Sequence, residues 1–109
     1  MDNISAGELR KLTFTVPFGR RVLYLRGKGL AKVPEALTDL TELEVLGLSD
    51  NYLKELPTSI NKLKNLKWLI LDNNQLRELP HSICELSNLT WLDVDYNQLS
   101  VLPANIKHL

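Results

Sequence analysis

The stretch LKWLILDNNQLRELP, residues 66–80, decides the fold class of this chain of 109 residues. Its leucines fall at positions 66, 69, 71, 76 and 79, so their spacings are three, two, five and three. An amphipathic helix needs apolar residues three or four apart, and a half-buried strand needs strict alternation, so neither pattern describes the whole stretch. An internal repeat would account for such a spacing of leucines.

The same spacing of apolar residues recurs every 23 residues without a gap. LEVLGLSDNYLKELPTSINKLKN covers 43–65, LKWLILDNNQLRELPHSICELSN covers 66–88, and LTWLDVDYNQLSVLPANIKHL covers 89–109. A weaker copy, RRVLYLRGKGLAKVPEALTDLTE, covers 20–42. The prolines at 34, 57, 80 and 103 and the asparagines at 51, 74 and 97 keep the same interval. The chain is therefore predicted to consist of an N-terminal cap, residues 1–19, and four repeats, 20–42, 43–65, 66–88 and 89–109.

The apolar pattern of each copy resembles the leucine-rich repeat, LxxLxLxxNxLxxLPxxIxxLxx, over residues 20–109. The length and the LPxxI segment are similar to the intracellular class, which includes Ras-group plant proteins, Scribble-type scaffolds and the Ras-binding repeats of fungal adenylyl cyclase. Bacterial effectors use related repeats. The resemblance implies an α/β solenoid, a right-handed horseshoe segment with a parallel sheet on its concave side and short helical or 3-10 legs on its convex side. It leaves the function open, because one fold serves many partners.

The residues themselves give a physical reason for such a coil. A strand over 68–72 would point Leu69 and Leu71 into the core and the alternate side chains outward. The asparagine that follows each strand can pair turn backbone groups that would otherwise be buried without partners. Lys28 occupies this position in the first copy and can only donate, so the ladder of amides should begin at Asn51.

Both ends depart from the repeat. KLTFTV, residues 11–16, alternates and is followed by a turn candidate, PFG, so residues 5–19 predict a β-hairpin that caps the edge of the first coil. The last copy stops two positions short of a full repeat and would expose core leucines such as Leu102 and Leu109. We expect either a fragment of a longer protein or an edge that pairs with another molecule, for example as a homodimer.

Composition excludes several classes of function. Thirteen basic residues balance thirteen acidic ones, so neither nucleic acid nor a membrane surface is an expected partner. The single cysteine, Cys84, cannot form an internal disulfide, and no secretory signal or membrane span is visible. The sequons at Asn3 and Asn88 would matter only in a secreted chain. A cytoplasmic location is therefore predicted.

The outward strand positions should form columns across the concave face, because residues one repeat apart become neighbours. The columns are Val22, Val45, Trp68 and Trp91; Tyr24, Gly47, Ile70 and Asp93; Arg26, Ser49, Asp72 and Asp95; and Gly27, Asp50, Asn73 and Tyr96. Exposed aromatic residues rimmed by charge are typical of a binding hot spot. The predicted partner-binding residues are Tyr24, Arg26, Trp68, Ile70, Asp72, Trp91, Asp93, Asp95 and Tyr96. Alternatively, the two tryptophans only stabilise the sheet by cross-strand packing.

Catalysis and metal binding are disfavoured. Asp72 and Asp95 should lie side by side, with Asp93 close by, and paired carboxylates can perform acid–base chemistry or hold a hard cation. The predicted surface is open, however, and offers no nucleophile or histidine beside them. His81 and Cys84 should lie on the convex side without metal-ligand spacing. We expect no enzyme activity, no metal and no cofactor.

The pattern as a whole predicts a non-enzymatic protein–protein interaction module that binds a protein or peptide through its concave face. The resemblance to Ras-group repeats makes a small GTPase or another signalling protein an admissible partner. The alternative is a structural module that self-associates through its C-terminal edge, or a fragment of a larger signalling scaffold or effector.

Overall fold

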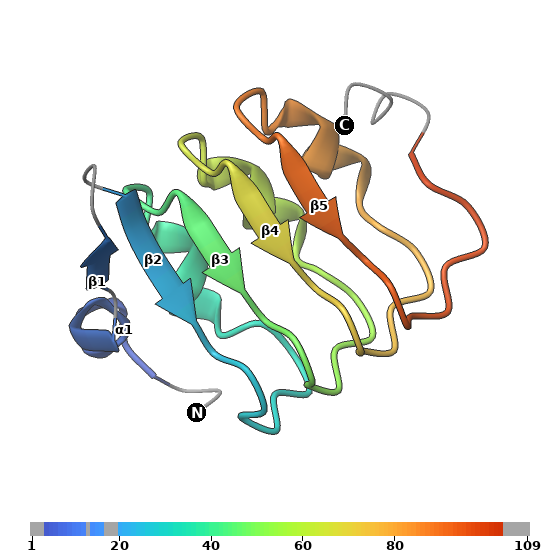
Figure 1. Cartoon of the computed structure of the whole chain (residues 1–109), viewed down its shortest axis with the longest axis horizontal. Helices are drawn as coiled ribbons and strands as arrows, with labels where there is room; N and C mark the ends of the chain where they lie inside the picture. The colour runs from blue at the N-terminus through green and yellow to red at the C-terminus, as the bar shows by residue number, and fades with distance from the viewer. Residues whose placement is uncertain (1–3, 13, 17–19, 104–109) are drawn as a thin grey trace.

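Among the residues that the structure describes, five strands form one sheet whose order follows the chain. The computed structural model describes residues 4–12, 14–16 and 20–103. The strands are β1 (Phe14–Val16), β2 (Arg20–Tyr24), β3 (Val45–Gly47), β4 (Trp68–Ile70) and β5 (Trp91–Asp93). β1 pairs antiparallel with β2, as the predicted hairpin cap requires, and β2 to β5 are parallel. Figure 1 shows the sheet in front and the return legs behind it, which confirms the predicted solenoid.

The strands are paired in register with the repeat. Val22 pairs with Val45, Val45 with Trp68, and Trp68 with Trp91, so each partner is one repeat further along the chain. Backbone hydrogen bonds continue beyond the strands, for example from the Leu71 N–H to the Asp93 carbonyl at 2.7 Å. Residues one repeat apart are therefore neighbours across the strands, as the predicted columns require.

Leucines of successive coils form one continuous core. Leu69 and Leu71 of the third coil are fully buried, and so are their equivalents Leu46 and Leu48 one coil earlier. Each leucine stacks on the leucines one repeat away, so no coil buries its apolar side without its neighbours.

In the described part of the chain, three return legs are 3-10 helices that begin after a proline. They are η1 (Glu35–Asp39), η2 (Thr58–Lys62) and η3 (His81–Glu85), preceded by Pro34, Pro57 and Pro80. A proline ring holds φ near −65°, which suits the entry of a helical turn, and here φ is −55°, −69° and −66°. Each leg buries an apolar residue against the core, which confirms the short convex legs that the sequence predicts.

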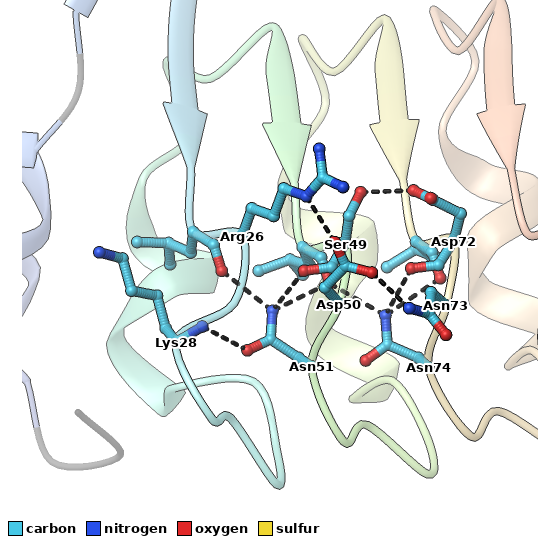
Figure 2. Close-up of polar contacts among 11 residues, drawn as sticks. Arg26, Lys28, Ser49, Asp50, Asn51, Asp72, Asn73 and Asn74 are labelled. Carbon is cyan, nitrogen blue, oxygen red and sulfur yellow. Dashed lines mark hydrogen bonds and ion pairs between the residues drawn. The ribbon is translucent and has the colours of Figure 1, made fainter.

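A ladder of buried asparagine amides joins the coils where the strands end (Figure 2). The Asn51 Oδ1 accepts from the backbone N–H of Lys28 at 3.1 Å and of Leu30 at 2.9 Å. Its Nδ2 donates to the carbonyls of Leu25 and Leu48 at 2.9 and 3.0 Å. Asn74 and Asn97 continue the ladder one and two coils later, and each engages one backbone N–H and one carbonyl of the coil before it. The ladder begins at Asn51, as predicted.

The N-terminal cap contains a helix that the alternation of residues 11–16 does not predict. Helix α1 (Ala6–Leu12) includes the first two of these residues, so the expected strand from Lys11 is wrong and β1 begins only at Phe14. Ser5 caps the helix, because its Oγ accepts from the Glu8 N–H at 3.1 Å, and the resulting turn buries Leu9 completely. The predicted PFG turn lies outside the described residues.

Helix α1 is fixed to the first return leg by charge as well as by its apolar contact. The Arg10 Nε donates to the Glu42 Oε2 at 2.8 Å, and Arg10 also reaches the Asp39 carbonyl at 3.3 Å. The guanidinium group holds the pKa of the Glu42 carboxyl below its ordinary value. The cap therefore closes the first coil on the convex side as well as along the sheet edge.

Candidate functional site

Two tryptophans lie side by side on the solvent-facing side of the sheet. Trp68 of β4 and Trp91 of β5 are register partners, so their α-carbons belong to strands about 4.8 Å apart. Trp68 is 37% exposed and Trp91 is 58% exposed, whereas Leu69 and Leu92, between the outward positions, point to the core side. The adjacency and exposure that the sequence predicts for the two indoles are confirmed.

The first column, to which both tryptophans belong, is buried at its N-terminal end. Val22 and Val45 are each only 2% exposed, although alternation places them on the concave side. Val45 lies between Val22 and the much larger Trp68 in the sheet, so its short side chain is flanked by neighbours. The exposed apolar surface is therefore confined to the C-terminal part of this column.

Tyr24 lies across the strand next to its own. A β-carbon built on Gly47 would overlap Tyr24 Cδ1 and would stand 3.0 Å from Cε1. The missing side chain of Gly47 thus lets the phenol ring lie against the β3 backbone while 49% of Tyr24 stays exposed. Tyr24, Gly47 and Ile70 then line a shallow hollow with Arg26, Ser49 and Asp72.

Polar contacts within the protein lie just beyond the ends of strands β2, β3 and β4 (Figure 2). Arg26 pairs with Asp50, whose other carboxylate oxygen accepts from the side-chain amide of Asn73. These two contacts, the Asn73 amide first and the Arg26 guanidinium second, hold the pKa of Asp50 below its ordinary value. One coil later, the Ser49 hydroxyl donates to the Asp72 carboxylate.

The carboxylates of the last described coil are arranged differently. The Asp93 Oδ1 accepts from the Asp95 backbone N–H at 3.1 Å, and the Asp95 side chain is exposed. Within residues 4–12, 14–16 and 20–103, no lysine or arginine forms an ion pair with Asp72, Asp93 or Asp95. Tyr96, the next residue, is 83% exposed.

The fourth column has a shared backbone conformation. Gly27, Asp50, Asn73 and Tyr96 have φ of 64°, 55°, 57° and 56°, which is the left-handed region. Glycine, aspartate and asparagine tolerate this region better than other residues, so tyrosine is the exception of the four. The turn after each strand therefore aims the third and fourth columns in the same way in every coil.

Two other groups singled out by the sequence do not join this face. His81 is exposed at the start of η3, and Cys84 is a half-buried free thiol on the same leg. In the described part of the chain, no three histidine, cysteine or acidic side chains come together as metal ligands. No helix among these residues is long and apolar enough to cross a membrane.

A family model for a leucine-rich repeat region matches residues 19–109. The chain belongs to the leucine-rich-repeat family. A leucine-rich-repeat protein of Leptospira interrogans is 40% identical with a TM-score of 0.76, over 80% of this chain and 22% of that one. A chain of the Toll–Spatzle complex of Drosophila is 37% identical with a TM-score of 0.62, over 72% of this chain and 11% of that one. No curated protein matches the chain.

A third solved structure supports the fold alone. A chain of the SNF/U2A′ complex of Drosophila melanogaster is 21% identical with a TM-score of 0.60, over 92% of this chain and 72% of that one. The leucine-rich-repeat chain spans only 22% and 11% of the lengths of the first two similar chains.

Sequence reasoning missed three features of the leucine-rich-repeat surface. Asp50 engages Arg26, Gly47 accommodates Tyr24, and a second amide ladder joins the coils between the 3-10 legs and the next strands. In that ladder the Asn65 Nδ2 donates to the Thr41 carbonyl at 3.0 Å, and Asn88, the sequon residue, donates to the Lys64 carbonyl at 2.8 Å. The recurrence of asparagine at the last position of two repeats was a readable signal for it.

Proposed function

We propose that this chain is a non-enzymatic protein-interaction module that binds a protein or peptide through its concave face. The observation that carries the proposal is the pair of adjacent, exposed indoles of Trp68 and Trp91. Large aromatic side chains lose little conformational entropy on binding and remove much apolar surface from water, so they dominate protein interfaces. Tyr24 and Ile70 extend this surface toward the N-terminal coils.

The comparisons support protein binding as the general role. One of the similar chains, 37% identical, comes from a complex between two proteins, Toll and Spatzle. An open face without a group of metal ligands among the described residues also favours binding over chemistry.

The finer proposals concern the class of repeat and of partner. We take the 23-residue LPxxI pattern as that of the intracellular class, with a cytoplasmic location and a small GTPase or another signalling protein as partner. The residues proposed to touch this partner are Tyr24, Arg26, Trp68, Ile70, Asp72, Trp91, Asp93, Asp95 and Tyr96. Arg26 and Asp72 would meet it while holding their internal partners, Asp50 and Ser49.

Affinity capture followed by mass spectrometry tests this function. The native chain and the variant Trp68→Ala/Trp91→Ala serve as baits, and Tyr52→Ala is the control because Tyr52 is 59% exposed but lies outside the four columns. The double variant should lose the captured protein, while its circular dichroism spectrum and that of the control remain native. Undiminished capture by the double variant would show that the concave indoles are not the contact.

A second candidate function has one observation in its favour. Leu92, Val94 and Leu99 of the last described coil are half-buried, and Leu102 is 46% exposed, whereas their counterparts in the preceding coil are almost completely buried. This edge could stack on a further coil or on a second copy of the chain. Light scattering over a dilution series would reveal a concentration-dependent dimer, and a constant monomer mass would exclude self-association.

A further inference from the structure

We propose that the partner presents a basic segment, and that its lysine or arginine side chains dock on the C-terminal half of the concave face. This acidic–aromatic platform consists of Ile70, Trp91, Asp93, Asp95 and Tyr96. The inference rests on the proposed function, since it names the chemistry of the partner for the same face.

The N-terminal half of the face is already neutralised within the protein. Arg26 forms an ion pair with Asp50, and Asn73 donates to the second oxygen of the same carboxylate. Both oxygens of Asp50 are thus engaged, and the one arginine in the third column is matched. Within the four columns, the residues of this half therefore carry no net charge.

The C-terminal half carries negative charge without a matching cation. Asp93 lies beside Ile70 in the second column, and Asp95 lies beside Asp72 in the third. No ion pair involving these three carboxylates is formed among residues 20–103 or the described parts of the cap. Carboxylates on an inner curved surface reinforce one another's field, so an approaching cation is attracted and an anion is repelled.

Aromatic side chains flank these carboxylates. Trp91 precedes Asp93 by two positions on the same face of β5, and Tyr96 follows Asp95 directly. Their exposed fractions are 58% and 83%. An arginine or lysine stem can lie along an indole or phenol ring while its charged end meets a carboxylate. Arginine fits this combination best, because its planar group stacks and can bind a carboxylate through two donors.

The same features disfavour other occupants. Nucleic acid and acidic peptides would face like charge at Asp93 and Asp95. A bare cation would need several converging ligands, and the described residues contain no group of three. A basic peptide satisfies both parts of the platform at once.

Intrinsic fluorescence provides a direct readout, because both tryptophans of the chain lie on this face. The probe is the synthetic peptide Gly-Arg-Leu-Arg-Leu-Arg-Gly, with acetylated and amidated ends. Two counterparts replace arginine by neutral citrulline or by glutamate. We expect the arginine peptide to change the emission and to bind at least about tenfold more tightly than either counterpart at low salt, with the difference shrinking as salt screens the charges. Absence of binding by the arginine peptide up to about 1 mM, or equal binding of all three, would overturn the proposal.

A matched pair of variants locates the charge selection. Asp93→Asn/Asp95→Asn should weaken binding of the arginine peptide by about three- to tenfold, which is the range expected from two partly exposed ion pairs. Glu55→Gln/Glu78→Gln removes the same charge from exposed positions between the strands and the 3-10 helices, and should leave binding unchanged. An equal loss of peptide affinity in both double variants would show a general charge effect and would contradict docking on the platform.

The two proposals fail in different ways. If capture of a cellular protein depends on Trp68 and Trp91 but not on Asp93 and Asp95, the concave face binds its partner and the basic segment is wrong. If neither substitution affects capture, the concave function itself is wrong.

Discussion

The phenol ring of Tyr24 on β2 lies directly over the α-carbon of Gly47 on β3, in space that any other residue would fill with its β-carbon. Glycine usually weakens a strand, since it loses the most backbone freedom and offers no side chain to pack. At this position its lack of a side chain sets the pose of the neighbouring aromatic residue.

Substitution of Gly47 by alanine should therefore destabilise the protein by forcing Tyr24 off the sheet. We expect a loss of about 1–2 kcal/mol in the free energy of unfolding, since overpacking in close-packed positions typically has this effect. The sign should change in a Tyr24→Ala background, where alanine gains about 0.5 kcal/mol or more over glycine in the strand. Urea denaturation of the four proteins in this double-mutant cycle measures both values. Equal losses in the two backgrounds would show that the ring does not limit the position.

The asparagine ladder predicts a graded series of losses. Asn74 is 7% exposed, and its amide engages the Leu53 N–H at 3.0 Å and the carbonyls of Leu48 and Leu71 at 2.9 and 3.1 Å. Asn74→Ala would leave several of these groups without partners, and each such group costs about 1–3 kcal/mol. We expect a total loss of about 3 kcal/mol or more, or failure to fold.

Asn97→Ala is the comparison that keeps this prediction testable. Asn97 makes equivalent bonds, including one to the Leu76 N–H at 3.0 Å, but it lies in the last described coil and is half-buried. Water can replace part of the contacts that Asn97 makes. The free energy of unfolding should therefore fall clearly less in Asn97→Ala than in Asn74→Ala. The same loss at both sites, measured by urea denaturation, would contradict the burial gradient.

The ladder and the columns could be predicted because one gapless repeat equals one coil. Residues 23 apart in the sequence, such as Trp68 and Trp91, then become neighbours whatever the details of the turn. The buried state of Val22 and Val45 was not predictable from this register, since it depends on how neighbouring side chains fold over the sheet. Periodicity thus fixes which residues share a column and leaves their exposure open.

The cap and the internal ion pair show what a repeat pattern cannot supply. The helix α1 has only seven residues and includes Gly7, so its propensity is weak, and the capping-box spacing of Ser5 and Glu8 was its one clear signal. Arg26 pairs with Asp50, which is 24 residues away and belongs to the next column. The pairing depends on the side-chain conformer that Arg26 adopts, and the spacing of residues in the sequence does not determine that conformer.

Tyr96 should be a site where stability can be gained. Its φ of 56° lies in the left-handed region, which Gly27, Asp50 and Asn73 occupy in the other coils. In this region a residue with an ordinary side chain destabilises the fold by about 1–2 kcal/mol. Asparagine destabilises it less, because its short side chain can form local hydrogen bonds. Tyr96→Asn should therefore raise the free energy of unfolding by about 1 kcal/mol in chemical denaturation.

Tyr52→Asn is the control for this gain. Tyr52 is 59% exposed and is not among the residues with positive φ, so the same exchange of side chains relieves no backbone strain. Its free energy of unfolding should stay the same or fall slightly. A gain of equal size at both tyrosines would show that removal of exposed aromatic surface, and not backbone geometry, is responsible.

The last prediction concerns stability in acid. The side-chain amide of Asn73 and the guanidinium of Arg26 hold the pKa of Asp50 below its ordinary value in the folded protein. A carboxyl whose pKa is lower when folded stabilises the protein above the unfolded pKa, and this contribution disappears as pH falls through the folded pKa. Asp50→Asn keeps a residue that tolerates the left-handed φ of 55° and can still accept from Asn73, so it removes mainly the charge.

The difference in unfolding free energy between the native protein and Asp50→Asn should consequently be largest near pH 7. It should begin to shrink as pH falls through the ordinary range of an aspartate carboxyl, and it should continue to shrink until the carboxyl is protonated in the folded state as well. Urea denaturation at intervals of pH measures this difference, and Asp95→Asn serves as the control because Asp95 is exposed and lies outside the ion pairs formed among the described residues. A difference that stays constant from pH 7 to about pH 2 would mean that the charge of Asp50 is not what Arg26 and Asn73 stabilise.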